Sequence, residues 1–217
     1  MTDTAFWDNL AEEYSAKPVE LPSAFERKIE ITQSLMLPSD VVLDIGCGTG
    51  TLALRLASSG EHVHALDLSG EMIRIAQEKR DAQNLANVTF YHGAFDESFA
   101  AIPDDSLDGI CAYSFLHLIE DRAAALQHIH RLLKPGGFFV SSTACLGESW
   151  VPFTPILALL RWIGKAPLVK VVGKDTLEEE LKQAGFVDIA QPDVGAKART
   201  AFMVASKPRR QSTFRLA

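Results

Sequence analysis

Three glycines at alternate positions, Gly46, Gly48 and Gly50, follow five largely apolar residues and precede a stretch with helical character. A strand, a tight turn and a helix are therefore predicted here, and glycines in such a turn let a ligand approach the main chain closely. The first N–H groups of a helix lack partners within it, so we expect them to face a ligand over the turn. Asp44, two residues before the first glycine, favours a ligand with a cation and hydroxyls. The alternative is a purely structural strand–helix turn.

The spacing of these glycines distinguishes between two kinds of ligand. The dinucleotide fingerprint G-x-G-x-x-G requires its third glycine where this chain has Thr51. Residues 43–50, Leu-Asp-Ile-Gly-Cys-Gly-Thr-Gly, instead resemble motif I of the class I S-adenosylmethionine-dependent methyltransferases. The resemblance implies that S-adenosylmethionine is the cofactor and that it is bound at Asp44, Gly46, Cys47, Gly48 and Gly50.

Asp67 ends the next predicted strand, downstream of the glycine turn. Ligands of an open α/β sheet lie beyond the carboxyl ends of its strands, so this carboxylate could accept both hydroxyls of a ribose. Leu68 and Met72 could then contact the adenine. The alternative for Asp67 is a helix N-cap or an ordinary surface carboxylate.

The resemblance covers roughly residues 40–145 and continues more weakly to 205. Gly93, Ala94 and Phe95 follow the third predicted strand, where the family usually has Gly-Asp or a close relative. Because Ala94 replaces the acid, we expect the backbone N–H of Ala94 or Phe95 to contact the adenine, with Asp96 as the alternative. Tyr113 is a further expected cofactor contact.

The loop after the fourth predicted strand, residues 113–117, is where this family selects the acceptor nucleophile. It lacks the Asn/Asp-Pro-Pro-Tyr/Phe pattern of enzymes that methylate amino groups of nucleic acids. His117, in a Leu-His pair typical of the family, could be a general base, or it could be a packing or cofactor-contacting residue. We expect His128 and His130 to face solvent. Tyr14 could close over the cofactor as a lid or pack in the core.

Segments with strand and helix periodicity alternate along the chain. They predict an α/β fold: a doubly wound, mostly parallel, seven-stranded sheet of Rossmann-like methyltransferase type with N-terminal helices. We expect helix N-caps at Ser23 with Glu26 and at Thr176 with Glu179. The expected strands are residues 41–45, 61–67, 88–92, 107–113, 138–142, 186–189 and 200–205.

A single domain is expected over residues 1–207, followed by a disordered tail at 208–217. Within it, residues 1–38 would form a helical lid and residues 146–174 an apolar insertion that covers the substrate. The insertion is rich in large apolar residues and broken by prolines and Gly164. A packed extension, a dimer contact and a membrane surface near Arg161 and Lys165 are its alternative roles.

Composition limits the class of partner. The net charge of -7 argues against a nucleic acid held through many phosphates. Cys47, Cys111 and Cys145 have no metal-ligand spacing, so we expect buried reduced thiols, no metal site and a cytoplasmic location. No apolar run is long enough to span a membrane, and the N-terminus lacks a signal-peptide pattern. A monomer or homodimer is expected.

The resemblance implies an S-adenosylmethionine-dependent methyltransferase that transfers a methyl group to a small, partly apolar acceptor by in-line displacement. Fold alone does not fix function. A non-catalytic S-adenosylmethionine-binding protein and a methyltransferase acting on tRNA or protein are therefore the alternatives, and a NAD-dependent reductase is a more distant one.

Overall fold

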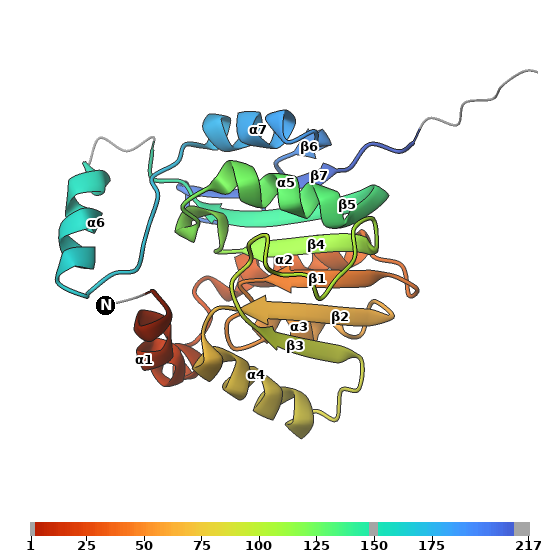
Figure 1. The fold of residues 1–217 in the computed structure, drawn as a ribbon, viewed down its shortest axis with the longest axis horizontal. Coiled ribbons are helices and arrows are strands. Elements are labelled where there is room, and N and C mark those ends of the chain that lie inside the picture. The colour runs from red at the N-terminus through yellow and green to blue at the C-terminus, as the bar shows by residue number, and fades with distance from the viewer. Residues whose placement is uncertain (1–2, 148–151, 211–217) are drawn as a thin grey trace, which may run out of the picture.

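The computed structural model describes residues 3–147 and 152–210, which form a seven-stranded sheet flanked by helices (Figure 1). The strand order is β3-β2-β1-β4-β5-β7-β6. The strands are β1 Val41–Ile45, β2 His62–Asp67, β3 Val88–His92, β4 Leu107–Tyr113, β5 Leu133–Ala144, β6 Val187–Ala190 and β7 Thr200–Ser206. The helices are α1 Asp3–Ala16, α2 Pro22–Ser34, α3 Thr51–Leu56, α4 Gly70–Ala82, η1 Leu116–Leu118, α5 Arg122–Leu132, α6 Phe153–Trp162 and α7 Lys174–Gln183.

The pairing confirms the predicted mostly parallel sheet. Strands β1 to β5 pair in parallel, and β7 pairs antiparallel with both β5 and β6. The chain moves outward from β1 to β3 and then returns to place β4 on the other side of β1. This reversal between β1 and β4 is the point where open α/β sheets bind ligands. The parallel strands end on the side where α1 and α6 lie (Figure 1).

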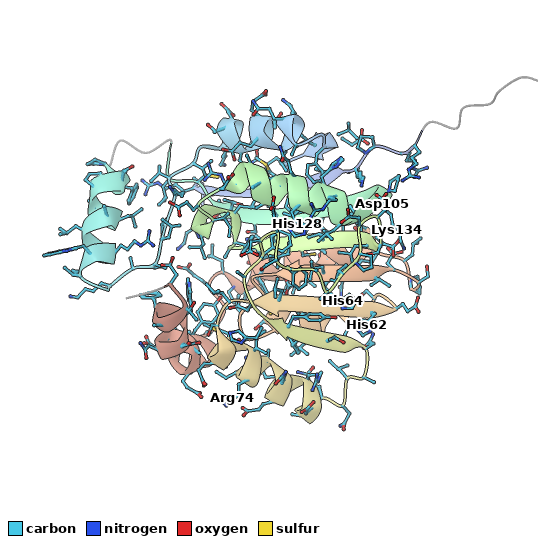
Figure 2. All side chains as sticks on the ribbon, in the orientation of Figure 1. His62, His64, Arg74, Asp105, His128 and Lys134 are labelled. Carbon is cyan, nitrogen blue, oxygen red and sulfur yellow. The ribbon has the colours of Figure 1, made fainter. Side chains whose placement is uncertain are left out.

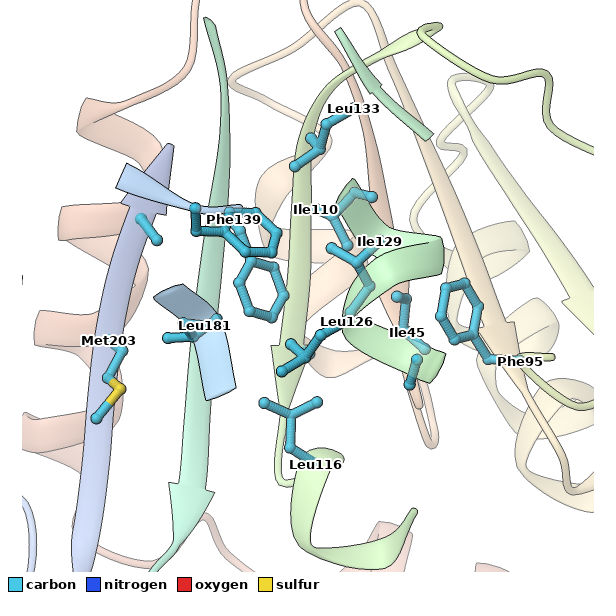
Figure 3. Packing of buried hydrophobic residues seen from close by; sticks show 14 of the residues in the cluster. Ile45, Phe95, Ile110, Leu116, Leu126, Ile129, Leu133, Phe139, Leu181 and Met203 are labelled. Carbon is cyan, nitrogen blue, oxygen red and sulfur yellow. The ribbon is translucent and has the colours of Figure 1, made fainter. Parts of the chain in front are cut away.

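Two hydrophobic clusters pack on opposite faces of the sheet because successive strand side chains point to opposite faces. Leu43 and Ile45 of β1 belong to one cluster, with residues of α5 and α7. Val42 belongs to the other, with residues of α2, α3 and α4. Figure 3 shows the first cluster, in which Ile110 of β4 and Ile129 of α5 lie close together. The sheet is therefore held rigidly on both faces, and its strand ends are fixed in position.

Helix α1 packs against α4 beside the carboxyl ends of the strands. Trp7 lies against a small cluster formed by Ala11, Met72 and Ile75. Ser69 caps α4 by accepting a hydrogen bond from the Met72 N–H, and its hydroxyl donates to Asp8 of α1 at 2.6 Å. The N-terminal helix is thus attached to the first turn of the helix that follows Asp67.

The helix starts are the least accurate predictions. Helix α2 begins at Pro22 after Leu21 in the left-handed region, and no side chain caps it, so the expected cap at Ser23 is wrong. Helix α7 begins after Gly173, again without a side-chain cap, so the expected cap at Thr176 is also wrong. Strand β5 begins at Leu133, five residues earlier than expected, because the chain becomes extended as soon as α5 ends.

The predicted apolar insertion contains the ten-residue helix α6, none of whose residues is buried. Pro152 precedes this helix, and Gly164, with a φ of 72°, follows its end. Trp150 and residues 211–217 of the expected tail lie outside the described residues. Arg210 is placed and pairs with Asp105. Within the described ranges, no helix is long and apolar enough to cross a bilayer.

Candidate active site

A cavity of about 350 Å³ opens at the carboxyl ends of β1, β2 and β4, beneath α1 and residues 167–168. This volume lies within the range of roughly 300–1,000 Å³ found for ligand pockets. The cavity brings together most of the residues predicted to bind cofactor or acceptor. They are Tyr14, Gly46, Gly48, Asp67, Leu68, Met72, Gly93, Ala94, Phe95, Tyr113 and His117. Three predicted contacts, Asp44, Cys47 and Gly50, do not line it.

The three glycines of the turn all have positive φ, but the space around Gly48 differs from that around Gly46 and Gly50. A Cβ on Gly46 would lie 2.7 Å from the Phe115 ring, and one on Gly50 would lie 3.0 Å from Ala76 and Phe90. Both positions therefore exclude side chains because of packing. A Cβ on Gly48 would meet only the Tyr14 ring, at 3.7 Å. Gly48 is thus the glycine whose missing side chain leaves room for a ligand.

Three N–H groups of the turn that precedes α3 are not free, those of Gly46, Cys47 and Gly48. Those of Gly46 and Cys47 donate to the carbonyl of Leu66, at 2.8 and 3.0 Å. That of Gly48 donates to Asp67 Oδ2 at 2.8 Å. Chain atoms therefore satisfy the turn's donors and hold its shape.

Asp67 is the carboxylate that lines the cavity beside the glycine turn. Besides Gly48, it accepts the N–H of Ser69 through Oδ1 at 2.9 Å. Ser69, rather than Asp67, is the N-cap of α4. Burial raises the pKa of Asp67, and the two backbone hydrogen bonds oppose that rise. Each carboxylate oxygen has a second lone pair, so Asp67 can still accept a ligand hydroxyl.

Asp44 and Cys47 are buried and do not line the cavity. Asp44 is 1% exposed, and its Oδ2 has no hydrogen-bond partner among the described residues. Burial, and then the charge of Asp67, raise the pKa of Asp44 to about 8. Burial also raises the pKa of the Cys47 thiol, which excludes a thiolate nucleophile here. These two residues can affect a bound ligand only indirectly, through their electrostatic field or through the conformation of the turn.

The wall beyond Asp67 has features suited to a flat heterocycle. Leu68 and Met72 supply apolar surface. The N–H groups of Ala94 and Phe95 make no hydrogen bond within the described part of the chain, so they are available as donors. Asp96, the alternative contact, also lines the cavity and accepts the N–H and hydroxyl of Ser98 through Oδ1.

The two tyrosines differ in what their hydroxyls can do. The Tyr113 hydroxyl donates to the carbonyl of Lys28 at 3.0 Å and lies 2.8 Å from the Thr32 hydroxyl, so only its ring can contact a cofactor. Tyr14 stays half-exposed at the cavity, which excludes the core-packing alternative. Desolvation and the charge of Asp67 raise the pKa of Tyr14, which keeps its hydroxyl protonated as a donor.

His117 lies in η1 at the cavity wall. Its carbonyl accepts the Lys170 N–H at 2.7 Å, and its Nδ1 is buried without a partner among the described residues. Desolvation, and then the charge of Arg122, lower the pKa of His117 to about 4. The imidazole is therefore neutral near pH 7 but a weaker base than a free histidine.

The expectation that His128 faces solvent is wrong. Its ring is buried on the sheet side of α5 and stacks on Phe95, with 4.6 Å between ring centroids (Figure 2). His130 is half-buried and lies edge-on to Phe186. The signal was present in the sequence, because His128 lies three residues after Ala125 and four before Leu132, both of which are buried.

The sequence did not identify the residues that close the cavity from above. Asp3 accepts the Leu168 N–H through Oδ1 at 3.0 Å and pairs with Arg161 through Oδ2 at 3.3 Å. It thus joins α1 to the segment after α6, and no periodic pattern could predict a contact across that distance in sequence. Of the predicted insertion, only Pro167 and Leu168 line the cavity among the described residues. The other unpredicted lining residues are Trp7, Ile45, Leu66, Leu118 and Ile119, and Ser114 and Phe115 line it from the predicted acceptor loop.

The chain is similar in sequence to known methyltransferases. The family described as "Methyltransferase domain" matches residues 42–137. The O-methyltransferase rstn1 of Aspergillus nomiae is 31% identical over 156 residues, which cover 70% of this chain and 67% of that protein. A demethylmenaquinone methyltransferase of Geobacillus kaustophilus is 28% identical over 197 residues, which cover 76% of this chain and 81% of that protein.

Among solved structures, phosphoethanolamine N-methyltransferase 2 of Haemonchus contortus superimposes with a TM-score of 0.77 at 19% identity. The match covers 96% of this chain and 61% of that one, and the structure holds S-adenosylhomocysteine. At this identity the likeness supports the fold alone. The sequence relatives supply the rest: the chain belongs to the class I S-adenosylmethionine-dependent methyltransferases. It is an enzyme that uses S-adenosylmethionine as its methyl donor.

Proposed function

We propose that this enzyme methylates a small, partly apolar acceptor held between α1, the loop after β4 and residues 167–168. The observation that carries the proposal is the composition of the cavity lining. It combines Asp67 and the glycine turn with large apolar residues that include Trp7, Phe115 and Leu168. The polar groups suit a cationic cofactor, and the apolar surface suits a partly apolar acceptor.

The residues present fit S-adenosylmethionine. Gly48 leaves space for it over the turn, and Asp67 can accept its ribose hydroxyls. Leu68 and Met72 would contact its adenine, with the N–H of Ala94 as a donor to the ring. When bound, the cofactor supplies an electrophilic methyl group on a sulfonium.

Because the donor is already reactive, the chain's own task is positioning and exclusion of water. Trp7 and Leu168 close the cavity from above, since Asp3 ties their two segments together. The acceptor would then lie near Ser114 and His117, the polar groups of the opposite wall. We propose that His117 orients the acceptor and takes up its proton as the methyl group is transferred.

The names of the relatives support a small acceptor. One is named as a demethylmenaquinone methyltransferase and another as an O-methyltransferase. The net charge of -7 also favours a small molecule over a nucleic acid. Three buried free cysteines support a reducing, cytoplasmic location.

The test is a methyl-transfer assay with pairs of acceptors that match in size and differ in polarity. Formation of S-adenosylhomocysteine is measured for phenols with alkyl substituents and for their hydroxylated counterparts. We expect the apolar member of each pair to have the higher kcat/KM. The Gly48→Val variant is the control without cofactor binding, because a branched side chain would fill the cradle.

A preference for the polar members would contradict the proposed acceptor class. Transfer only to tRNA or to protein would replace it with a macromolecular substrate. Cofactor binding without transfer to any acceptor would indicate a non-catalytic binding protein.

A further inference from the structure

Helix α6 has an apolar face that no part of the described chain covers. It stands at the edge of the molecule, beside α1 and apart from the sheet (Figure 1). Several of its side chains extend away from the rest of the chain (Figure 2). Trp162 is 83% exposed and Leu159 is 57% exposed, with Ile156 and Ile163 beside them. The inward face, formed by Phe153 and Leu157 among others, is only half-buried. An exposed apolar patch of this kind ordinarily marks a surface that contacts a partner protein or lipid.

The charge around α6 is opposite to that of the whole protein. Residues 149–174 contain Arg161, Lys165, Lys170 and Lys174 and no Asp or Glu, and this range is flanked by Glu148 and Asp175. Arg161 pairs with Asp3, and Lys170 lies 3.8 Å from Glu120. Lys165, one turn beyond the end of α6, is exposed and has no ion-pair partner in the described part of the chain. A basic segment on a protein with a net charge of -7 is suited to a negatively charged surface.

We propose that α6 docks this enzyme on an anionic lipid bilayer. Trp162 and Leu159 would enter the boundary between headgroups and acyl chains, and Lys165 would lie among the lipid phosphates. Tryptophan favours this boundary, and cations near it are attracted by anionic lipid. This docking site would place the enzyme at a membrane surface, whichever acceptor the enzyme methylates.

A second copy of the chain fits this face less well. A two-fold interface places the same surface of each copy against the other. Lys165 of both copies would then lie at that interface without an ion-pair partner in the described part of the chain, whereas Arg161 is already paired with Asp3. A bilayer of anionic lipid has no such conflict.

The position of α6 also links the bilayer to the cavity. Only four residues separate Trp162 from Pro167, which lines the cavity. Docking would therefore place the acceptor side of the cavity close to the membrane surface. An apolar acceptor dissolved in lipid would reach the enzyme with a short path through water, a consequence that rests on the proposed function.

The experiment measures sedimentation of the full-length protein with vesicles of phosphatidylglycerol or of phosphatidylcholine. We expect at least about fivefold tighter binding to the anionic vesicles, with a blue shift of tryptophan emission. Trp162→Asp is expected to weaken that binding by roughly tenfold or more. Lys165→Gln is expected to reduce the preference for anionic vesicles by about fivefold.

Two variants elsewhere serve as matched controls. Leu37→Asp places the same charge at an apolar residue that is 62% exposed, just before β1 at the opposite edge of the sheet. Lys182→Gln removes an exposed lysine from α7. Both are expected to bind vesicles like the wild type. Calorimetry with S-adenosylmethionine must give the same affinity for every variant, which shows that each is folded.

Absence of binding to phosphatidylglycerol vesicles, or binding that Leu37→Asp and Trp162→Asp reduce equally, would overturn the proposal. Ultracentrifugation showing a wild-type dimer that Trp162→Asp dissociates would also overturn it, since a second copy would then cover α6. Failure of methyl transfer to small acceptors would refute the proposed function and leave the vesicle result standing, so the two can be distinguished.

Discussion

Asp67 has two roles, one in the structure of the turn and one in the proposed cofactor contact, and two substitutions are needed to distinguish them. It holds the Gly48 N–H in the turn, and it is the cavity carboxylate that can accept ribose hydroxyls. Asp67→Ala removes both, whereas Asp67→Asn keeps the shape and one acceptor oxygen but loses the charge. We expect both variants to weaken S-adenosylmethionine binding by roughly tenfold to a hundredfold, because charge-assisted hydrogen bonds contribute about 1.5–3 kcal/mol. Calorimetry showing wild-type affinity in both would refute the ribose contact.

Asp44 predicts an unusual dependence of stability on pH. Its pKa is about 8 in the folded protein, against an ordinary value of 3.8. The folded state therefore binds the extra proton between these two values, and the free energy of unfolding falls as the pH rises through this window. Asp44→Asn should remove that loss and stabilise the protein above pH 8 by about 1–3 kcal/mol. Urea unfolding from pH 5 to 9 measures the free energy of unfolding of the wild type, of Asp44→Asn and of the exposed control Asp81→Asn. The same dependence of this free energy on pH in all three proteins would contradict the prediction.

His117 predicts where the acid limb of the reaction lies. Its pKa is about 4, so it stays unprotonated well below the ordinary value of 6.5. We expect turnover to decline only near pH 4, and His117→Ala to lower turnover by roughly a hundredfold with cofactor affinity little changed. The unfolded chain binds more protons between pH 6.5 and 4, so the fold itself loses stability as the pH falls there. Turnover must therefore be measured briefly after a pH jump, before the protein unfolds. Near-normal turnover of His117→Ala would contradict the role as a base and would leave positioning of the substrates as the means of catalysis.

At the scale of elements, Asp3 connects two covers that are far apart in sequence. Asp3→Ala should break the hydrogen bond from Leu168 and raise hydrogen exchange of the Leu168 amide by roughly tenfold. Arg161→Gln should change it little, because the Arg161–Asp3 pair is partly exposed. Faster cofactor dissociation in Asp3→Ala alone would follow from the same opening. Unchanged exchange in Asp3→Ala would show that the segment is held by other contacts.

Strands were predicted well from hydrophobic periodicity, whereas helix starts that depend on the backbone torsion of one residue were not. The strands from β1 to β4 match their predicted positions within one residue, because each is a short apolar run between turn residues. The start of α2 depends instead on Leu21 adopting a φ of 52°, which no pattern around Ser23 signals. Caps compete with water and with tertiary contacts, so a motif alone does not decide where a helix begins.

For the whole molecule, cofactor binding should appear as thermal stabilisation. A ligand at one hundred times its Kd adds about 2.7 kcal/mol to the folded state, or roughly 5–10 °C in Tm for a chain of this size. We expect this with S-adenosylmethionine and S-adenosylhomocysteine. NAD should give no shift, because Thr51 replaces the third glycine of the dinucleotide fingerprint. A larger shift with NAD would reverse the assignment of the cofactor.

The site was predictable wherever it follows from the topology of the sheet. Asp67 and Phe95 lie at strand ends, so the strand pattern alone brings them to one edge. Trp7 and Leu168 reach the same cavity from segments outside the sheet, and their positions depend on packing and on Asp3. Asp44 lies on the predicted strand, but it was predicted to contact the cofactor and does not line the cavity. Sequence spacing does not tell whether a side chain next to a turn points into the cavity or into the core.

The internal hydrogen bonds of the glycine turn have a consequence for kinetics. Leu66 and Asp67 hold the turn's N–H groups before any ligand arrives, so its left-handed torsions are set when the protein folds. A preorganised cradle loses little conformational entropy on binding. The association rate of the cofactor should then depend on how often the cover joined by Asp3 opens, while the glycine turn itself imposes no delay.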